Sequence, residues 1–295
     1  MTIHTAQVEE RGVLRVAGED AASFLQGLLT NDVEGLAVDE ARYAALLTPQ
    51  GKILFDFLVL RVAAESGMAF LIDCPAAQAG ELAKRLGFYR LRAKVTISDE
   101  SVDHAVVAFW GEGASALTPS AVMAGTSPAM TDGALEQFFY VDPRDPHLGL
   151  RAILPRAKAA ALANSRAADY DAHRIKLGVP SGGIDFAYAD IFPHDANLDL
   201  LHGVDFEKGC YVGQEVVSRM RHRGGARKRI VRLALTGAAP PSGTPVLAGE
   251  TLVGALGSAV EGRALALVRL DRVEDARLAG LSLTAGGVGV EIEAV

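Results

Sequence analysis

The chain has 295 residues, enough for two domains of ordinary size or three small ones, and 49% of them are apolar and 22% charged, as in globular proteins. Its two cysteines, Cys74 and Cys210, lie far apart, which excludes a disulfide framework and is typical of a reducing compartment. No uncharged apolar run is long enough to span a membrane, and the first ten residues lack the pattern of a secretory signal or transit peptide. A cytoplasmic protein is therefore expected.

The first 110 residues predict a helix followed by a compact α+β lobe, which is formed by the elements between 51 and 110. Apolar residues at helical spacing predict a helix over 20–33, with Asp20 as its cap. Two strands, a helix and two further strands are then expected at 51–61, 68–73, 75–87, 94–98 and 104–110. Asp56 is conspicuous because a carboxylate inside an apolar strand must find a partner or face a cavity.

The second half of the chain changes several times in composition and in the structure it predicts. Residues 111–135 predict loops with at most one helix, and helices are expected at 155–168 and 170–177. Residues 181–209 are irregular, and a loop of this length is usually either disordered or functional. We favour a functional loop, because it leads into the most distinctive segment of the chain. Short strands between Gly-rich turns then predict a separate antiparallel barrel, at 230–235, 246–247, 251–256, 264–270 and 288–292.

The net charge of −7 hides a basic run. Residues 219–232 contain seven basic and no acidic residues, whereas the rest of the chain carries 22 basic and 36 acidic ones, a net charge of −14. Such a run either attracts an anionic ligand or forms a solvated, salt-bridged face, and the sequence leaves both possibilities open.

Several common motifs are absent from the sequence. It has no phosphate-binding or dinucleotide-binding glycine loop and no serine-nucleophile elbow. Its histidines and cysteines lack the spacing of zinc ligands, so no metal site is expected. The basic run lacks the interleaved aromatic residues that stack bases, so no stable binding of nucleic acid is expected either.

The segment Lys208-Gly-Cys-Tyr-Val-Gly-Gln-Glu215 contains the strongest candidate for a reactive group. Its glycines, Gly209 and Gly213, permit tight turns and close approach of other groups to the backbone. Lys208 and the following arginines favour the thiolate of Cys210, whereas Glu215 opposes it. Cys210 and Lys208 are therefore the predicted catalytic pair, while Cys74 is expected to be a small buried apolar residue.

This segment, extended to Arg219, resembles the signature of the YgfZ-type folate-binding proteins. These are relatives of the glycine-cleavage T-protein, an aminomethyltransferase, and they support the assembly and repair of iron–sulfur clusters. The resemblance covers most of the chain, because similar stretches occur in the right order at 24–33, 47–54, 89–94, 174–180 and 193–198.

The resemblance implies an α+β protein with the three-lobed fold of the T-protein and a C-terminal antiparallel β-barrel. A discontinuous folate-binding domain would comprise residues 1–45 and 140–228. The α+β lobe, of ferredoxin-like type, would be inserted as residues 46–139, and the barrel would comprise residues 229–295.

The resemblance also implies a tetrahydrofolate cofactor, or a one-carbon derivative of it, and partners among iron–sulfur proteins or their assembly machinery. A pterin needs a buried carboxylate to accept its paired N–H donors, and Asp195 lies where the transferases place such an acid. The basic run from Arg219 would meet the anionic glutamate tail. The full set of expected cofactor-binding residues is Asp56, Asp195, Asn197, Tyr211, Gln214, Glu215 and Arg219.

Two functional classes compete at this point. The first is a folate-dependent aminomethyl or one-carbon transferase, and the second is a folate-binding assembly factor in which Cys210 is the working group. Transferases tend to have an adjacent acidic pair where this chain has Phe55-Asp56, which favours the assembly factor. A conventional cluster takes four thiolates and the chain offers one good candidate, so it cannot hold a cluster alone in this way. Cys210 could bridge to a cluster on a partner, form a mixed disulfide or attack an electrophile, and the sequence does not choose among these. An effect on tRNA modification would be indirect, through iron–sulfur enzymes.

Overall fold

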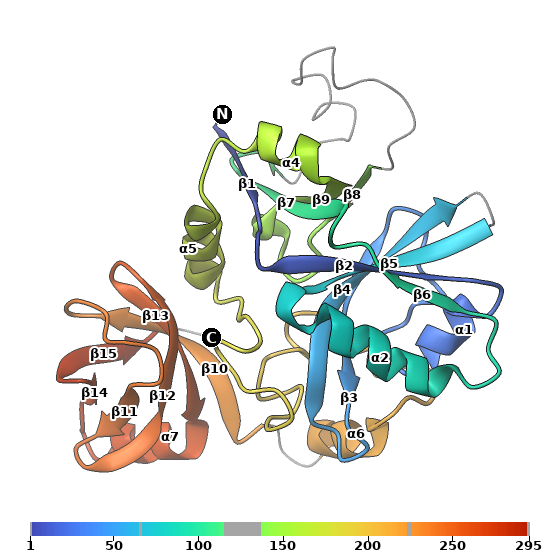
Figure 1. The fold of residues 1–295 in the computed structure, drawn as a ribbon. Coiled ribbons are helices and arrows are strands. Elements are labelled where there is room, and N and C mark those ends of the chain that lie inside the picture. The colour runs from blue at the N-terminus through green and yellow to red at the C-terminus, as the bar shows by residue number, and fades with distance from the viewer. Residues whose placement is uncertain (1, 65–66, 115–136, 223–225, 294–295) are drawn as a thin grey trace. The chain divides into compact units, whose positions relative to one another are not determined.

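The computed structural model describes residues 2–64, 67–114, 137–222 and 226–293. Their contacts divide the chain into two compact units, each assembled from separate stretches of sequence. Unit 1 comprises Met1–Leu46, Phe55–Tyr170 and Asp205–Tyr211, and unit 2 comprises Leu47–Leu54, Asp171–Val204 and Val212–Val295. The chain therefore passes repeatedly from one unit to the other. Figure 1 labels the helices and strands and colours the chain by residue number.

Unit 1 is built on two antiparallel sheets. The first has the strand order β1-β7-β9-β8, formed by Ile3–Gln7, His104–Gly111, Leu150–Pro155 and Phe138–Val141. The second has the order β3-β4-β5-β2-β6, formed by Ala41–Leu47, Ile53–Ala64, Gly67–Pro75, Arg11–Ala17 and Thr96–Asp99. Strands β1 and β2, which the sequence assigns to the discontinuous first domain, thus pair with β7 and β5 of the predicted inserted lobe.

Short helices cover the sheets of unit 1. Helix α2 (Ala79–Arg90), preceded by the 3₁₀ turn η1 (Ala76–Gln78), packs on β2 and β6. Helix α4 (Arg156–Leu162) covers the first sheet, and the 3₁₀ turn η4 (Pro146–Leu148) precedes β9. The helix predicted over 20–33 is shorter in the structure, where α1 spans Ala21–Gln26. The Asp20 carboxylate does not cap this helix and instead accepts the backbone amide of Lys94 at 2.7 Å.

The helix predicted over 155–168 is also interrupted. Helix α4 ends at Leu162, and α5 (Ala167–Leu177) begins five residues later. Between them the amides of Asn164 and Ser165 both donate to the carbonyl of Thr5, at 2.9 and 3.0 Å. Bonds to strand β1 therefore replace helical bonds and override the local preference for a helix. The single helix predicted within 111–135 falls almost entirely outside the described residues.

Unit 2 contains the predicted barrel. Six antiparallel strands close it in the order β10-β13-β12-β11-β14-β15 around a core of aliphatic side chains. The strands are Lys228–Leu235 (β10), Pro245–Ala248 (β11), Thr251–Val260 (β12), Arg263–Arg269 (β13), Leu283–Ala285 (β14) and Val288–Ile292 (β15). Helix α7 (Leu270–Leu278) connects β13 to β14. The expected α+β class with a C-terminal antiparallel barrel is confirmed.

The long irregular segment of unit 2 is held by one buried arginine. Arg174 of α5 donates to the carbonyl of Val179 at 3.0 Å, to the Asp185 carboxylate at 2.9 Å and to the Ser258 hydroxyl at 2.7 Å. Asp185 also accepts the amide of Ser258 at 2.6 Å, so the segment is tied to strand β12. Because these buried polar groups satisfy one another, the segment has a defined conformation despite its lack of regular structure.

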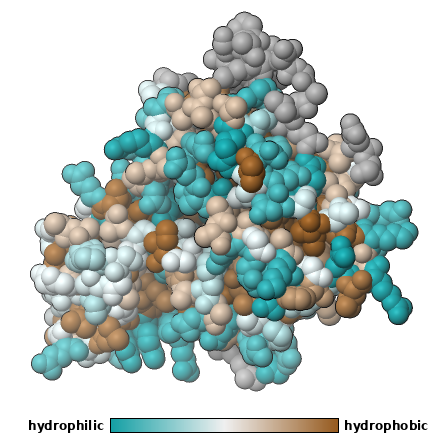
Figure 2. All heavy atoms as spheres, viewed as in Figure 1, coloured by the Kyte–Doolittle hydropathy of each residue, from teal (hydrophilic) through white to brown (hydrophobic). Residues whose placement is uncertain are grey.

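Hydrophilic side chains cover much of the face seen in Figure 2, with hydrophobic ones scattered between them. Within the described parts of the chain, no helix has the length and apolar character needed to cross a bilayer.

Candidate functional site

The segment that carries Cys210 is fixed within unit 1 by Lys208. The Lys208 ammonium donates to the carbonyl oxygens of Gln26, Leu29 and Asn31, at 2.9, 2.7 and 2.7 Å. These carbonyls lie at the end of α1 and just beyond it, where a helix leaves carbonyl groups without partners. An ammonium has three donors, and Lys208 uses all of them.

The environment of Lys208 separates its role from that of Cys210. Burial lowers the pKa of Lys208 to about 8, against the opposing effect of the Asp32 and Asp205 carboxylates. Its ammonium lies 5.4 Å from the ring centroid of Tyr211, which is buried. The Cys210 side chain is exposed. Lys208 therefore anchors the segment that carries the exposed thiol. Its catalytic role beside Cys210 stays a prediction.

Gly213 and Gly51 allow two distant segments of unit 2 to meet. Gly213 has φ +83°, and a Cβ added to it would lie 2.6 Å from the carbonyl oxygen of Thr48 and 3.0 Å from the Cα of Gly51. A Cβ on Gly51, at φ +81°, would lie 2.9 Å from the Cβ of Val216. The turn at 47–51 and the start of helix α6 (Gln214–His222) thus pack backbone against backbone. Gly209, by contrast, has open space around it.

We expect Gly213→Ala to destabilise unit 2 and Gly209→Ala to have little effect. At Gly213 an added methyl group meets backbone atoms and an unfavourable φ, and strain of this kind costs about 1–3 kcal/mol. Urea unfolding of the two variants, followed by circular dichroism, provides a matched comparison of the same substitution in one segment. Equal stability of both variants would show that the close approach is relaxed without cost.

Asp195 and Asn197 lie together in a turn of unit 2 that is clamped to strand β10. The amide of Ile230 donates to the Asp195 carbonyl at 3.2 Å, and the Asn197 side-chain amide donates to the Ile230 carbonyl at 2.7 Å. Arg229 adds a bidentate pair with Asp199, at 2.5 and 2.8 Å, and a bond to the His194 carbonyl at 2.8 Å. The turn is therefore rigidly positioned.

The two side chains of this turn keep unused acceptor atoms. The Asp195 carboxylate accepts one long bond, from the amide of Phe192 at 3.3 Å, and burial raises its pKa. The Asn197 Oδ1 atom is buried and has no hydrogen-bond partner among the described residues. Both residues are about 6% exposed, so these acceptors are largely withdrawn from water. Buried acceptors without donors are costly, and a ligand that donates N–H groups would satisfy them.

Arginines of the basic run are used in structural contacts. Arg219 forms an ion pair with Glu215, one turn earlier on helix α6, and Gln214 begins the same helix. Arg229 pairs with Asp199, and Arg232 pairs with Glu293. For these three arginines the salt-bridged alternative holds. Arg227 and Lys228 remain exposed and form no ion pair within the described part of the chain.

Asp56 finds its expected partner inside unit 1. The Tyr43 hydroxyl donates to the Asp56 carboxylate at 2.9 Å, and Asp56 is 4% exposed. The Tyr43 ring in turn lies under the guanidinium of Arg144, 5.6 Å from its centroid. Burial raises the pKa of Tyr43 well above its usual value, so its hydroxyl stays protonated and donates.

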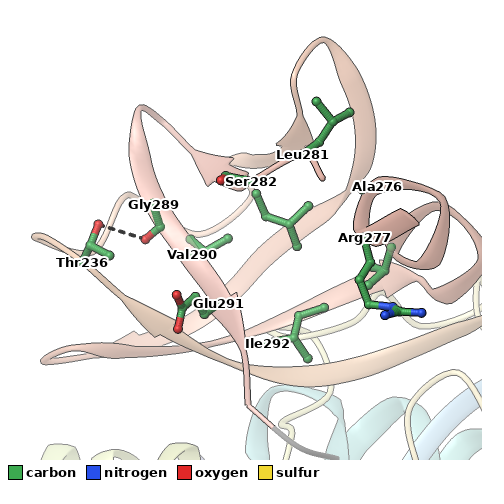
Figure 3. Close-up of a pocket in the computed structure, with 11 residues that line it drawn as sticks. Thr236, Ala276, Arg277, Leu281, Ser282, Gly289, Val290, Glu291 and Ile292 are labelled. Atoms are coloured by element: carbon green, nitrogen blue, oxygen red, sulfur yellow. Dashed lines mark hydrogen bonds between the residues drawn. The ribbon is translucent and has the colours of Figure 1, made fainter. Parts of the chain in front are cut away.

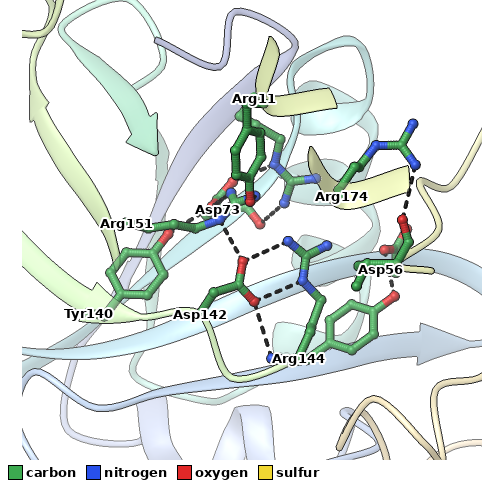
Figure 4. Close-up of polar contacts among 11 residues, drawn as sticks. Arg11, Asp56, Asp73, Tyr140, Asp142, Arg144, Arg151 and Arg174 are labelled. Carbon is green, nitrogen blue, oxygen red and sulfur yellow. Dashed lines mark hydrogen bonds and ion pairs between the residues drawn. The ribbon is translucent and has the colours of Figure 1, made fainter. Parts of the chain in front are cut away.

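Beside this pair lies a network of buried charges that the sequence did not predict. Figure 4 shows Asp142 between Arg144 and Arg151, which reach its carboxylate at 2.7 and 2.8 Å. Arg151 also bonds Asp73 at 2.6 Å, and Arg11 bonds the same carboxylate at 2.5 Å. The partners are up to 78 residues apart in sequence, so no local motif announces them. Their one local sign is an aspartate, Asp73, at the end of an apolar strand.

The predicted site residues therefore fall into separate groups. Unit 1 holds Asp56 and the segment with Lys208, Cys210 and Tyr211. Unit 2 holds the turn with Asp195 and Asn197, and helix α6 with Gln214, Glu215 and Arg219. The described residues contain no group of three or more potential metal ligands.

Comparison with known proteins gives the class first. Residues 4–133 match the family described as the GCVT N-terminal domain, and residues 227–294 match the C-terminal β-barrel domain of CAF17. The structure resembles that of glycine cleavage system aminomethyltransferase T from Bartonella henselae, with a TM-score of 0.77 and 20% identity over 99% of this chain and 85% of that one. The chain therefore has the aminomethyltransferase T fold.

Sequence comparison narrows this class to a family. The chain is 33% identical to the human mitochondrial iron–sulfur cluster assembly factor IBA57, over 86% of its own length and 72% of the relative's. It is 32% identical to the mouse protein of that name, over 80% and 68%. It is 36% identical to the IBA57 homolog of Mycosarcoma maydis but spans only 59% of that protein. The chain belongs to the IBA57 family.

These matches correct two expectations. The cytoplasmic location is wrong, because these relatives are named as mitochondrial proteins, which points to the mitochondrion. Globular composition without a long apolar helix suits any aqueous compartment and could not distinguish between them. The narrower resemblance to YgfZ-type proteins is not supported either, since the relatives are IBA57 proteins.

Proposed function

We propose that this protein supports the assembly or repair of iron–sulfur clusters in client proteins and that Cys210 is its working group. Membership of the IBA57 family supports the process, because its relatives are named iron–sulfur cluster assembly factors. The exposed thiol, on a segment fixed by the Lys208 anchor, is the observation that carries the proposal.

The chemistry of the thiol requires a partner. Cysteine thiolates hold iron–sulfur clusters, usually four to a cluster, and the second cysteine of this chain, Cys74, is fully buried. Cys210 therefore supplies one sulfur ligand to a cluster held mainly by an assembly or client protein. An effect on tRNA modification follows only indirectly, through clients that modify tRNA.

The test replaces Cys210 by alanine. Cells in which Cys210→Ala is the sole copy of the protein are expected to lose the activity of iron–sulfur client enzymes while the variant accumulates normally. Cys74→Ala, which removes the buried thiol, is the matched control and is expected to keep that activity. Full client activity with Cys210→Ala would remove this thiol from the proposal.

We further propose that the turn with Asp195 and Asn197 binds the pterin of tetrahydrofolate or of a one-carbon derivative. A pterin presents paired N–H donors. This turn offers a buried carboxylate that accepts a single long hydrogen bond and a buried amide oxygen that has no donor among the described residues. Gln214, Glu215 and Arg219, on helix α6 of the same unit, are proposed to bind folate as well. Asp56 and Tyr211 belong to unit 1, and their roles toward folate stay predictions.

Asp195→Asn is expected to weaken tetrahydrofolate binding by roughly tenfold or more, since bonds to a charged acceptor are worth about 1.5–3 kcal/mol. Asp190→Asn makes the same change at an exposed carboxylate in the same irregular segment, and it is expected to bind normally. Titration calorimetry at several pH values checks both variants. Because burial raises the pKa of Asp195, wild-type affinity should fall as the pH drops through that value, whereas Asp195→Asn should lack this dependence. Unchanged affinity in Asp195→Asn would exclude the residue.

The alternative is a folate-dependent aminomethyl transferase. This alternative is supported by the fold, which the chain shares with an aminomethyltransferase at 20% sequence identity. A shared fold does not specify which reaction a protein catalyses. Asp56 is the single acid at the expected acidic pair, and Tyr43 already occupies one of its oxygens. Robust aminomethyl transfer by the purified protein, together with a silent Cys210→Ala variant, would establish this alternative instead.

A further inference from the structure

One end of the barrel in unit 2 carries a pocket that the proposed function does not use. It has a volume of about 370 Å³ and lies between strands β12 and β13 and the start of α7. Its apolar wall includes Leu252, Ala255 and Val268, and three cationic side chains also line it: Lys228, Arg269 and Arg272. No acidic residue is among the residues that line it.

The cations of this pocket are held close together at some cost to the fold. Lys228 on β10 and Arg269 on β13 are directly paired across the sheet, so their side chains leave the same face. Like charges in this position destabilise a sheet. Arg269 is neutralised by Asp271, which it binds at 3.0 and 2.5 Å. Lys228 is exposed and has no ion pair among the described residues.

Arg272 completes the cationic side of the pocket. Its guanidinium donates to the carbonyl of Leu252, at 2.5 Å, which fixes it against the pocket wall and leaves further N–H donors available. Within the described part of the chain neither Lys228 nor Arg272 forms an ion pair, and no carboxylate lines the pocket beside them. The Asp195 carboxylate is close enough to Lys228 to interact with it electrostatically, but it is not among the lining residues. A carboxylate bound between them would relieve the repulsion and accept charge-assisted hydrogen bonds.

We propose that this pocket binds a small amphipathic carboxylate, with its apolar body against Leu252 and Ala255 and its carboxylate on Lys228 and Arg272. The volume is at the lower end of the range for ligand pockets, about 300–1,000 Å³, and suits a body of one or two rings or a short chain. The site shares no residue with the proposed folate site or with the Cys210 segment, so it stands independently of the proposed function.

A second pocket of the same barrel serves as an internal comparison. It has a volume of about 550 Å³ and lies beside α7 and strands β14 and β15 (Figure 3). Its charged residues are of opposite sign, Arg277 and Glu291, and Arg277 is paired with Glu274 at 2.7 and 2.8 Å. An apolar compound can enter both pockets, but a preference for a carboxylate is expected only in the first.

The experiment uses the full chain and two probes of nearly equal shape, 2-naphthoate and the uncharged 2-naphthamide, in titration calorimetry. The carboxylate is expected to bind at one site about tenfold more tightly than the amide, because it accepts charge-assisted bonds. Lys228→Gln should reduce this ratio, and Lys228→Gln combined with Arg272→Gln should bring it close to one. Ala255→Trp, which fills the pocket without changing its charge, should abolish binding of both probes at this site.

Two controls decide the assignment. Arg277→Gln, in the second pocket, should leave the ratio unchanged. Lys228 is exposed and makes no ion pair among the described residues, so Lys228→Gln is expected to fold normally. The affinity ratio of this single variant therefore tests the proposal even if a substitution at Arg272 disturbs the barrel. Equal affinity of the two probes for the wild-type protein would overturn the proposal. The proposal would also be overturned if the double variant kept the preference for the carboxylate over the amide, or if Arg277→Gln lost it.

Discussion

Arg151→Met is expected to lower the free energy of unfolding of unit 1 by about 3 kcal/mol, because removing one member of a buried ion-pair network leaves buried carboxylates with fewer positive partners. Arg151 is 3% exposed and bonds Asp142 at 2.8 Å, Asp73 at 2.6 Å and the Tyr170 hydroxyl at 3.0 Å. The loss falls at the lower end of the usual range, since Asp73 and Asp142 each keep one other arginine.

The sole tryptophan reports this change directly. Trp110 is buried in strand β7 of unit 1 and packs against Tyr170, with 5.4 Å between ring centroids. Its fluorescence during urea unfolding therefore follows the unit that contains the network. Arg166→Met, which breaks an exposed pair with Asp169, is the control and should leave the midpoint unchanged. Matching midpoints for Arg151→Met and Arg166→Met would show that the network contributes little to stability.

The same variant should also change the response to acid. Burial raises the pKa of Asp73, but Arg11 and Arg151 outweigh it and hold the pKa below its ordinary value. A carboxyl with a lowered pKa contributes stability above its unfolded pKa of about 3.9 and loses it as the pH falls through the folded value. Without Arg151 the pKa of Asp73 is lowered less, so acid unfolding should begin at a higher pH than in the wild type.

The two cysteines are expected to differ at least about 100-fold in their rate of alkylation by iodoacetamide at pH 8, because only a thiolate attacks. Burial raises the pKa of Cys74 to about 12, and its side chain is fully enclosed, so both its ionisation and its access are suppressed. Cys210 is exposed to the reagent. Peptide mass spectrometry over time measures both rates in one sample.

Denaturation supplies the control for this comparison. In urea above the unfolding transition the two thiols should react at similar rates, because burial no longer protects Cys74. Rapid labelling of Cys74 in the native protein would contradict its burial. Slow labelling of Cys210 would contradict the exposure on which the proposed function depends.

The sequence predicted those elements whose signal is local. The barrel strands alternate short apolar runs with glycine-rich turns, and the structure confirms them at nearly the expected residues. Strands β1 and β8 carry no such pattern, since Ile3–Gln7 is half polar and Phe138–Val141 is very short. They form because β7 and β9 supply partners, and those pairings were not visible in one sequence.

The candidate site divides in the same way. Close backbone approach at Gly213 was foreseen from the residue type, and the structure confirms it, whereas Gly209 needs no such freedom. The carbonyl partners of Lys208 lie 177 to 182 residues away, so its anchoring role could not be predicted. Helix α6 was also missed, because it is short and mostly polar, and Val217 is its only buried residue. The roles of Asp195, Asn197 and Asp56 toward folate stay predictions.

The interleaved chain of unit 1 has a consequence for synthesis. This unit cannot be completed until residues 205–211 have left the ribosome, because they follow a stretch that belongs to unit 2. At about 5–20 residues per second, roughly 10–40 s pass before Lys208 can meet the carbonyls at the end of α1. The segment that bears Cys210 is therefore the last piece of its unit to be added, and the thiol reaches its final setting only after the strands of that unit have been made.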